Sequence, residues 1–220
     1  MQETFKQCQE LVIKGQHFLL HPQKALFWVE QKALVLADAH FGKGRHFRKN
    51  GIPVPQMQAD VDYDRFIGLL LEFKPAQVIF LGDLFHSSYN EEWMAFSDII
   101  QKFQATQFIL VKGNHDILNP TIYEEGGIIM KEEPWRLGPF ALRHHPAEKN
   151  ETEYSIGGHL HPGVLLKGAS HQRLRLPCFY FGKTQAVLPA FGSFTGLHLV
   201  QPETESRVFV IGDGQVFEKS

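Results

Sequence analysis

Three short apolar runs alternate with two amphipathic stretches in the first half of the chain. The runs at 32–37 (KALVLA), 77–82 (QVIFLG) and 107–113 (QFILVKG) are rich in β-branched and aliphatic residues, as buried strands are. Between them, apolar residues recur at helical spacing over 61–73 and again over 93–103. The pattern therefore predicts a β-α-β-α-β order.

That order implies parallel strands, because right-handed crossovers return the chain to the same edge of a sheet. The carboxyl ends of the three strands then lie along one edge, where α/β sheets form their ligand sites. The second half is expected to form short strands instead, the last of them a hairpin turning at Asp213 and Gly214, over 139–145, 154–159, 173–182, 186–192 and 206–218. No repeat or linker separates the halves. We therefore predict an α/β fold in a single domain over 1–220, with two packed mixed β-sheets flanked by helices.

The amino-acid composition and the net charge limit which classes of partner the protein can attract. The chain has 220 residues, 43% of them hydrophobic, and a formal net charge of −2, so it can fill a core but has no global field that attracts polyanions. Cys8 and Cys178 lie in no metal-spaced motif and are expected to be reduced thiols. The sequence shows no signal peptide and no apolar run of about 18 residues. We expect a cytoplasmic protein that does not associate with membranes.

Residues able to bind metals gather where the predicted strands end. They are Asp38, His40, Asp83, His86, Asn114, His115, Asp116, His144, His145, His159 and His161. Carboxylates, a carboxamide and imidazoles together suit Mn, Fe or Zn better than Ca or Mg. If the backbone stays extended at the strand ends, residues two apart point the same way, so Asp38 with His40, and His159 with His161, would each grip one ion. The set exceeds the needs of one ion, which favours two bridged by a shared carboxylate.

The ordered motifs DxH, GD, GNHD, H and GHxH resemble those of the calcineurin-like metallophosphoesterase superfamily, whose fold is a β-sandwich flanked by helices. The resemblance implies a first metal on Asp38, His40 and His161. It implies a second on Asn114, His144 and His159, with Asp83 bridging. His144 is preferred to His145 because the superfamily's histidine commonly stands two residues before a proline, here Pro146.

A narrower resemblance covers nearly the whole chain. The stretches ADAHFGKGRHFRKNGIPVP, LGDLFHS, GNHD and GGHLHP are similar to bacterial ligase-associated DNA damage response phosphoesterases of the PdeM type. This resemblance implies work in DNA repair, in functional association with a DNA ligase and a helicase. GDLFH is also similar to the same motif in SbcD-type nucleases, where its histidine lies at the active site. His86 and Ser87 replace the Asp and Arg of the superfamily's protein phosphatases, which argues against a phosphoprotein substrate; alternatively, His86 only positions His115.

The expected chemistry is phosphodiester hydrolysis by a metal-bridging hydroxide, with two divalent ions, Mn²⁺ favoured and Fe or Zn as alternatives. His115 is expected to protonate the leaving oxygen or contact the phosphoryl group, and general acid catalysis of this kind contributes about 10²- to 10⁴-fold. Asp116 would orient His115, unless it is a surface turn residue. His115, His86 and Asp116 are thus the candidate catalytic residues.

The substrate is expected to be nucleic acid, with DNA favoured. Lys43, Arg45 and Arg48 follow the first metal motif directly and are candidate contacts for backbone phosphates, with Phe41 and Phe47 interleaved as stacking surfaces. The alternative is a solvated charged loop whose phenylalanines enter the core. A small-molecule phosphodiesterase or phosphatase is the second functional hypothesis. A metal-bearing scaffold is the third, although it would not need His115.

Overall fold

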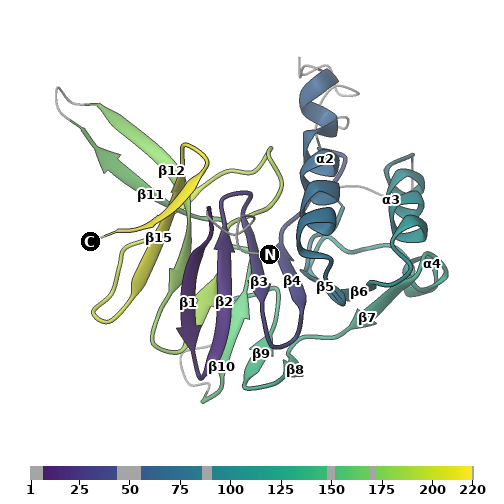
Figure 1. Cartoon of the computed structure of the whole chain (residues 1–220), viewed down its shortest axis with the longest axis horizontal. Coiled ribbons are helices and arrows are strands. Elements are labelled where there is room, and N and C mark those ends of the chain that lie inside the picture. Colours follow the sequence, from purple (N-terminus) through teal and green to yellow (C-terminus); the bar gives the residue numbers. More distant parts are fainter. Residues whose placement is uncertain (1–6, 44–55, 86–90, 148–151, 169–171, 220) are drawn as a thin grey trace.

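A computed structural model describes residues 7–43, 56–85, 91–147, 152–168 and 172–219; for 56–60 and 91–92 it describes the backbone alone. Two β-sheets lie face to face in the middle of the molecule, and helices cover the outer face of one of them (Figure 1). The predicted fold class, two packed mixed sheets flanked by helices, is confirmed.

The first sheet has seven strands in sequential order. Its first four strands pair antiparallel, and β4 to β7 pair parallel. The strands are β1 (Gln9–Ile13), β2 (Gln16–His21), β3 (Ala25–Trp28), β4 (Ala33–Ala37), β5 (Gln77–Leu81), β6 (Gln107–Val111) and β7 (Ile128–Lys131). The parallel strands predicted from the three apolar runs are β4, β5 and β6. Their carboxyl ends do meet at one edge, as expected.

In the described part of the chain, three helices cover the outer face of this sheet: α2 (Gln56–Phe73), α3 (Glu91–Lys102) and the short α4 (Pro120–Glu125). The predicted apolar stripes face the sheet, where Phe66, Leu70 and Phe96 are at most 1% exposed. Phenylalanine rings from helices and strands stack there in one cluster; the Phe66 and Phe96 ring centroids lie 5.9 Å apart. Packing of these stripes therefore fixes the helices against β4 to β6.

The second sheet is assembled from the short strands expected in the second half. Its strands are β8 (Trp135–Leu137), β9 (Phe140–Leu142), β10 (Tyr154–Gly157), β11 (Pro162–Lys167), β12 (Arg173–Phe181), β13 (Gln185–Val187), β14 (His198–Leu199), β15 (Arg207–Gly212) and β16 (Gln215–Glu218). β15 and β16 form the predicted hairpin, with positive φ at Asp213 and Gly214. Part of the β11–β12 hairpin extends beyond the body of the molecule (Figure 1).

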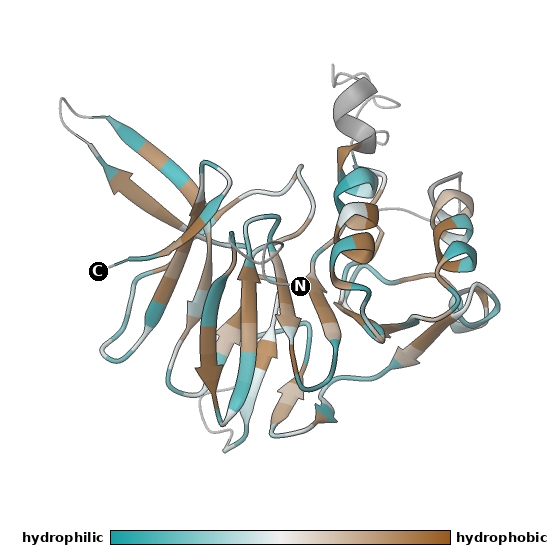
Figure 2. Ribbon diagram, viewed as in Figure 1, coloured by the Kyte–Doolittle hydropathy of each residue, from teal (hydrophilic) through white to brown (hydrophobic). Residues whose placement is uncertain are grey.

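A shared core joins the two sheets. Leu26, Val35 and Ile79 of the first sheet belong to the same buried cluster as Phe179 and Phe209 of the second. Figure 2 shows this concentration of hydrophobic residues along the strands. The shared core supports the single-domain prediction, which stays a prediction. No helix in the described part of the chain has the length and apolar character needed to cross a membrane.

Candidate metal centre

Five of the predicted metal ligands lie in left-handed turns just beyond strand ends. Asp38, His40, Asp83, His159 and His161 have φ angles of 49°, 44°, 53°, 67° and 50°. The expected extended backbone at these positions is therefore wrong. Non-glycine residues in this region each cost about 1 to 3 kcal/mol and cluster at functional sites. The turns, rather than strand periodicity, aim the side chains of each pair at a common point.

A first group of ligand atoms comes from Asp38, His40 and His161, all within 4.8 Å of one another. Asp38 is completely buried, and its Oδ1 lies 3.4 Å from His161 Nε2. The other oxygen, Oδ2, accepts the backbone N–H of His159 at 2.8 Å. Among the described residues Oδ1 has no hydrogen-bond partner. A buried carboxylate oxygen without a donor is costly unless a cation lies against it.

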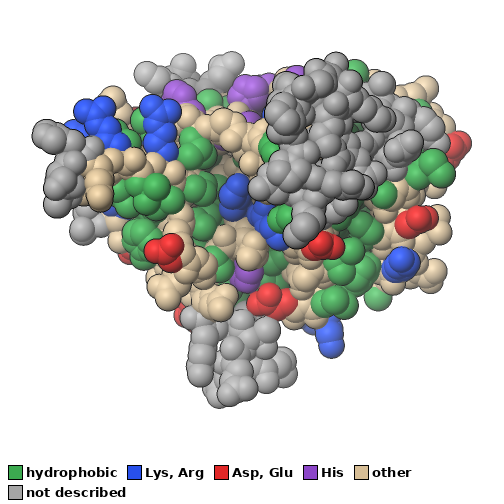
Figure 3. All heavy atoms as spheres, turned by 90° about the horizontal axis from the view of Figure 1, so that it is seen from above, with side chains coloured by type: hydrophobic (Ala, Val, Ile, Leu, Met, Phe, Trp, Pro, Cys, Tyr) green, Lys and Arg blue, Asp and Glu red, His purple; other side chains and the backbone are tan. Residues whose placement is uncertain are grey.

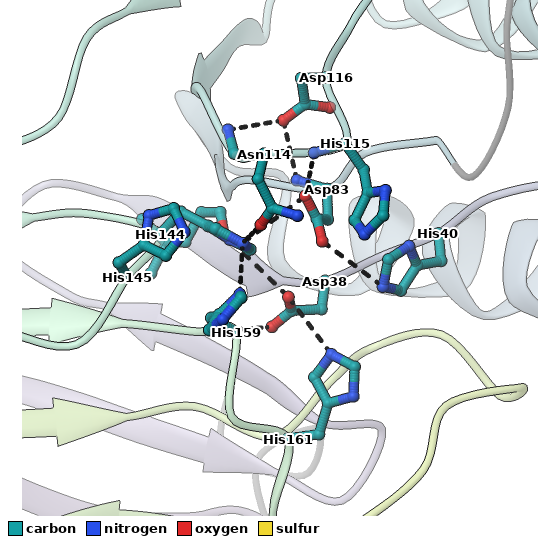
Figure 4. Close-up of polar contacts among 12 residues, drawn as sticks. Asp38, His40, Asp83, Asn114, His115, Asp116, His144, His145, His159 and His161 are labelled. Carbon is teal, nitrogen blue, oxygen red and sulfur yellow. Dashed lines mark hydrogen bonds and ion pairs between the residues drawn. The ribbon is translucent and has the colours of Figure 1, made fainter.

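A second group comes from Asn114, His144 and His159 (Figure 4). His144 Nδ1 lies 3.0 Å from the carbonyl oxygen of Leu81, so this nitrogen carries the proton and Nε2 presents its lone pair. That Nε2 faces Asn114 Oδ1 at 2.9 Å and His159 Nδ1 at 3.0 Å. Several lone pairs therefore converge on one point, an arrangement that a cation stabilises.

The surroundings of the His159 ring favour its neutral form. Burial lowers the pKa of His159, and the neighbouring His144 and His145 lower it further, against the opposing pull of Asp38 and Asp83. A neutral imidazole keeps the lone pair that metal binding requires. His159 is thus preorganised as a ligand at neutral pH.

Asp83 lies between the two groups. Its Oδ1 is 3.6 Å from His144 Nε2, and its Oδ2 is 3.8 Å from His40 Nε2. The backbone N–H of His115 donates to Oδ1 at 2.9 Å, which fixes the orientation of the carboxylate. Asp83 is 3% exposed. One carboxylate therefore turns one oxygen toward each group, the position that a bridging ligand needs.

Gly82 permits the close approach of the second group to the sheet edge. Its φ is 74°, and a Cβ built on it would overlap the imidazole ring of His144. Any side chain here would displace His144 from Asp83 and Asn114. The Gly-Asp order after β5 is thus a packing requirement as well as a motif.

The donor set fits divalent metals of the Mn, Fe and Zn type, since it combines imidazole nitrogens with carboxylate and carboxamide oxygens. The six candidate ligands of the two groups and Asp83 are brought together as predicted from the motifs. Their assignment to individual ions stays a prediction.

His145, which the motif comparison ranked below His144 as a metal ligand, contacts Glu133, a residue that the sequence analysis did not identify. Glu133 Oε2 accepts the backbone N–H groups of His144 and His145 at 2.7 and 3.0 Å, and its Oε1 lies 2.6 Å from His145 Nδ1. The His145 side chain is 44% exposed. Its ligand nitrogen also lies within 4.8 Å of those of His144 and His159, so His145 borders the second group. No spacing signal connects Glu133 to these histidines.

Asp116 is buried and ties two strand-end loops together. Its Oδ2 accepts the backbone N–H groups of Asp83 and Gly113, both at 2.8 Å, and its Oδ1 accepts that of Leu84 at 2.9 Å. The alternative of a surface turn residue is therefore wrong, because Asp116 is only 2% exposed. Burial raises the pKa of this carboxyl to about 6, with Asp83 adding to the rise and the backbone donors opposing it. These contacts place Asp116 as a support of Asp83; its action on His115 stays a prediction.

His115 and Lys43 lie at the mouth of the centre. His115 is exposed, and its ring centroid is 6.0 Å from that of His40. Lys43 is half-buried, and burial lowers its pKa, while Asp83 and Asp38 raise it. Its ammonium group therefore interacts electrostatically with the carboxylates of the centre. The other predicted catalytic and substrate-binding residues, His86, Arg45 and Arg48, lie outside the described residues.

A buried network that sequence reasoning missed braces the loop carrying Asp38. Gly192 N donates to the Asp38 carbonyl at 3.1 Å, so residues 191–193 lie against this loop. Arg65 of α2 holds that segment through the Phe191 carbonyl at 3.1 Å, and Asp62 accepts from Ser193 N at 3.0 Å. In the sequence, Asp62 and Arg65 could be recognised only as polar positions of a predicted helix.

Comparison with known proteins gives two matches. Residues 32–138 match the family model described as calcineurin-like phosphoesterase. A solved structure, the nuclease MPE of Pseudomonas putida, is similar at 30% identity and a TM-score of 0.79, covering 96% of this chain and 100% of its own.

The chain belongs to the calcineurin-like phosphoesterase family. As a member of this metallophosphoesterase family it is a hydrolase of phosphoesters that uses divalent metal ions. Among curated proteins, no match was found. The superfamily resemblance inferred from the motifs is therefore confirmed, together with a relative of the nuclease type.

Proposed function

We propose that the protein is a dinuclear metal-dependent phosphodiesterase that cleaves nucleic acid, with DNA favoured over RNA. The observation that carries this proposal is the position of Asp83 between two groups of ligand atoms. The similarity to the Pseudomonas putida nuclease supports nucleic acid as the substrate class. Manganese is the favoured metal, with iron or zinc as alternatives.

When bound, two metal ions would neutralise the phosphoryl oxygens and acidify a water molecule so that it can attack phosphorus. Asp38, His40 and His161 would hold one ion, Asn114, His144 and His159 the other, and Asp83 would contact both. Around them, Asp116 and Glu133 fix the backbone of the ligand-bearing loops by accepting N–H groups.

We propose that His115 acts on the leaving oxygen. Its backbone is anchored to Asp83, while its ring is exposed at the mouth beside His40. There it would donate a proton to the oxygen that departs from phosphorus, or bind the phosphoryl group. Lys43, whose ammonium group is attracted by the Asp38 and Asp83 carboxylates, would contact a phosphate oxygen at the mouth of the metal centre.

The biological setting proposed is DNA repair in the cytoplasm, alongside a DNA ligase and a helicase, on the basis of the motif resemblance. Co-purification of a tagged chain from cells with and without DNA damage tests that association. Recovery of neither enzyme under both conditions would remove the proposed setting and leave the hydrolase chemistry untouched.

The metal centre is tested by elemental analysis of Asp83→Asn. The amide oxygen can still accept the His115 N–H, so the loop is retained while the charge between the two groups is removed. We expect the protein saturated with Mn²⁺ to hold two ions per chain and the variant one or none. Asp64→Asn, an exposed carboxylate on α2, is the matched control and should keep both. Two ions retained by Asp83→Asn would contradict the bridging role.

Substrate class is tested by cleavage of DNA and RNA oligonucleotides beside bis(4-nitrophenyl) phosphate and 4-nitrophenyl phosphate. The proposal expects hydrolysis of oligonucleotides and of the diester. Hydrolysis of the monoester alone would instead favour a small-molecule phosphatase.

A further inference from the structure

The β11–β12 hairpin starts at the metal centre and carries a cluster of positive charge along its outer part. Its outer part, residues 164–167 and 173–176, is called the arm. In the antiparallel register Lys167 lies opposite Arg173, and Leu165 lies opposite Arg175. Because side chains alternate between the faces of a strand, Lys167, Arg173 and Arg175 all project from one face of the arm. All three are exposed.

The opposite face of the arm is apolar, and its inner part anchors the arm, whereas Leu174 farther out is 56% exposed. Val164 is buried in a small cluster with Cys178 and Tyr180, and Leu166 and Leu176 pack against that cluster. The arm therefore has an apolar face that packs at its inner end and a cationic face in solvent. Its cations are not needed to hold the hairpin in place.

Among the residues that the structure describes, no acidic side chain neutralises the charges of the arm. Its two strands contain no Asp or Glu, and within the described part of the chain no ion pair reaches Lys167, Arg173 or Arg175. Elsewhere in the same sheet the cations are paired, as Arg207 is with Glu218 at 2.6 Å. Like charges directly opposite each other on neighbouring strands are destabilising. A chain with net charge −2 thus carries an exposed cationic cluster on the arm.

The arm begins at the metal centre. β11 starts at Pro162, directly after the predicted ligand His161. At about 3.3 Å per residue along a strand, the cations lie roughly 13 to 20 Å from His161, a span of about four to six base pairs of duplex DNA. Seen from above, Lys and Arg side chains gather at the left, where Figure 1 places the arm, and histidine side chains lie beside them (Figure 3).

We propose that the cationic face of the arm binds the backbone of a DNA strand several nucleotides away from the bond cleaved at the metal centre, an inference that rests on the proposed nucleic-acid substrate. Phosphates at regular spacing complement a row of exposed guanidinium and ammonium groups. The arm would therefore act on long substrates only. A substrate with a single phosphodiester at the metal centre cannot reach cations 13 to 20 Å away, by the same spacing of about 3.3 Å per residue.

The test compares the triple variant Lys167→Gln/Arg173→Gln/Arg175→Gln with the wild type on three substrates: a 30-nucleotide single strand, the same strand as duplex, and bis(4-nitrophenyl) phosphate. The logarithm of the binding constant falls linearly with the logarithm of the salt concentration. Three phosphate contacts contribute about −2.1 to the slope of this line for single strands and about −2.7 for duplex DNA. From 50 to 200 mM salt the wild type should therefore lose about 20-fold and 40-fold more affinity, respectively, than the variant. Hydrolysis of bis(4-nitrophenyl) phosphate should be equal in both.

The matched control carries the same loss of charge at the opposite edge of the first sheet: Lys32→Gln/Lys74→Gln/Lys102→Gln. These exposed lysines line an open pocket at the amino ends of the parallel strands, away from the metal centre. The control should keep the salt slope of the wild type. Arg173→Lys/Arg175→Lys, which keeps the charges, should also retain it.

The outcomes separate the arm from the enzyme's chemistry. If the wild type cleaves oligonucleotides and the triple variant matches it in KM and salt slope, the arm does not bind DNA while the nuclease function stands. An equal loss in the lysine control would also overturn the role of the arm, since net charge alone would explain it. If the wild type hydrolyses the nitrophenyl diester but neither cleaves nor binds any oligonucleotide, the nucleic-acid function and the arm's role fail together. Circular dichroism melts of all variants check folding.

Discussion

Gly158 lies against Asp38 so closely that a single added carbon is expected to disturb the metal centre. A Cβ at this position would stand 2.5 Å from Asp38 Oδ2 and 2.8 Å from the Ala37 Cβ. The carboxylate would need to move by roughly 1 Å to reach ordinary van der Waals separation. That oxygen also accepts the His159 N–H at 2.8 Å, so the move would weaken this hydrogen bond.

The expected size of the effect follows from these contacts. Overpacking of a tight site costs about 1 to 3 kcal/mol of stability. A misplacement of about 1 Å at a reacting centre costs about 10²-fold in rate, equivalent to about 2.7 kcal/mol. Gly158→Ala should therefore melt at a lower temperature, bind less Mn²⁺ and hydrolyse bis(4-nitrophenyl) phosphate about 100-fold more slowly.

Gly196→Ala is the matched control, because a Cβ at Gly196 meets nothing within 4 Å. It should keep wild-type metal content and rate. The assays are elemental analysis after gel filtration, thermal unfolding and initial rates over a range of Mn²⁺ concentrations. Wild-type metal content and rate in Gly158→Ala would refute the claim that backbone contact fixes the Asp38 carboxylate.

Three further predictions concern other buried or exposed groups. Asp116→Ala leaves three backbone N–H groups without acceptors and should cost at least about 3 kcal/mol in urea unfolding; unchanged stability with reduced activity would instead favour a role confined to His115. His115→Ala should keep both metals and slow DNA cleavage by about 10²- to 10⁴-fold. Its effect on bis(4-nitrophenyl) phosphate should be smaller, because nitrophenolate leaves without a proton, and equal effects would argue against the acid role. Burial, assisted by Arg65, lowers the pKa of His21 to about 4, and its Nδ1 accepts from Gln23 N. The unfolded state therefore takes up this proton first, and stability should fall by about 2 to 3 kcal/mol between pH 6.5 and 4; His21→Gln should remove that part of the pH dependence, measured as unfolding free energy in urea.

The sequence predicted three of the four parallel strands of the first sheet, β4 to β6, because each of these is a mostly apolar run that is buried on both faces. The strand 77–81 has four fully buried residues, and the helix ending at Phe73 shows a clear apolar stripe. The strands β1 to β3, β7, β8, β11 and β14 and the short helix α4 were not predicted. These elements are short or partly exposed, and pairing with neighbours rather than local pattern decides them.

The order of the motifs predicted which residues form the candidate site, but it did not predict the geometry of the site. Asp38 and His40 were expected to share an extended strand end, but both lie in left-handed turns. Such turns depend on close contacts that are distant in sequence, such as the Phe41 N–H donated to Leu84 O and the Gly192 N–H donated to Asp38 O. Local sequence cannot specify contacts made by segments about 40 or 150 residues away, which is why tertiary packing overrides local preference.

The sequence by itself determined which residues can bind metal and the order in which they follow the strands, since side-chain chemistry and strand pattern are local properties. Only the tertiary structure decided how they meet: Asp83 lies between two groups, and Asp116 and Glu133 fix the loops that carry them. It also decided that β11 and β12, which follow His161, present an exposed cationic face. Those features arise where strands from both halves of the chain come together. Their distances are set by the packing of two sheets on one core, which no single segment encodes.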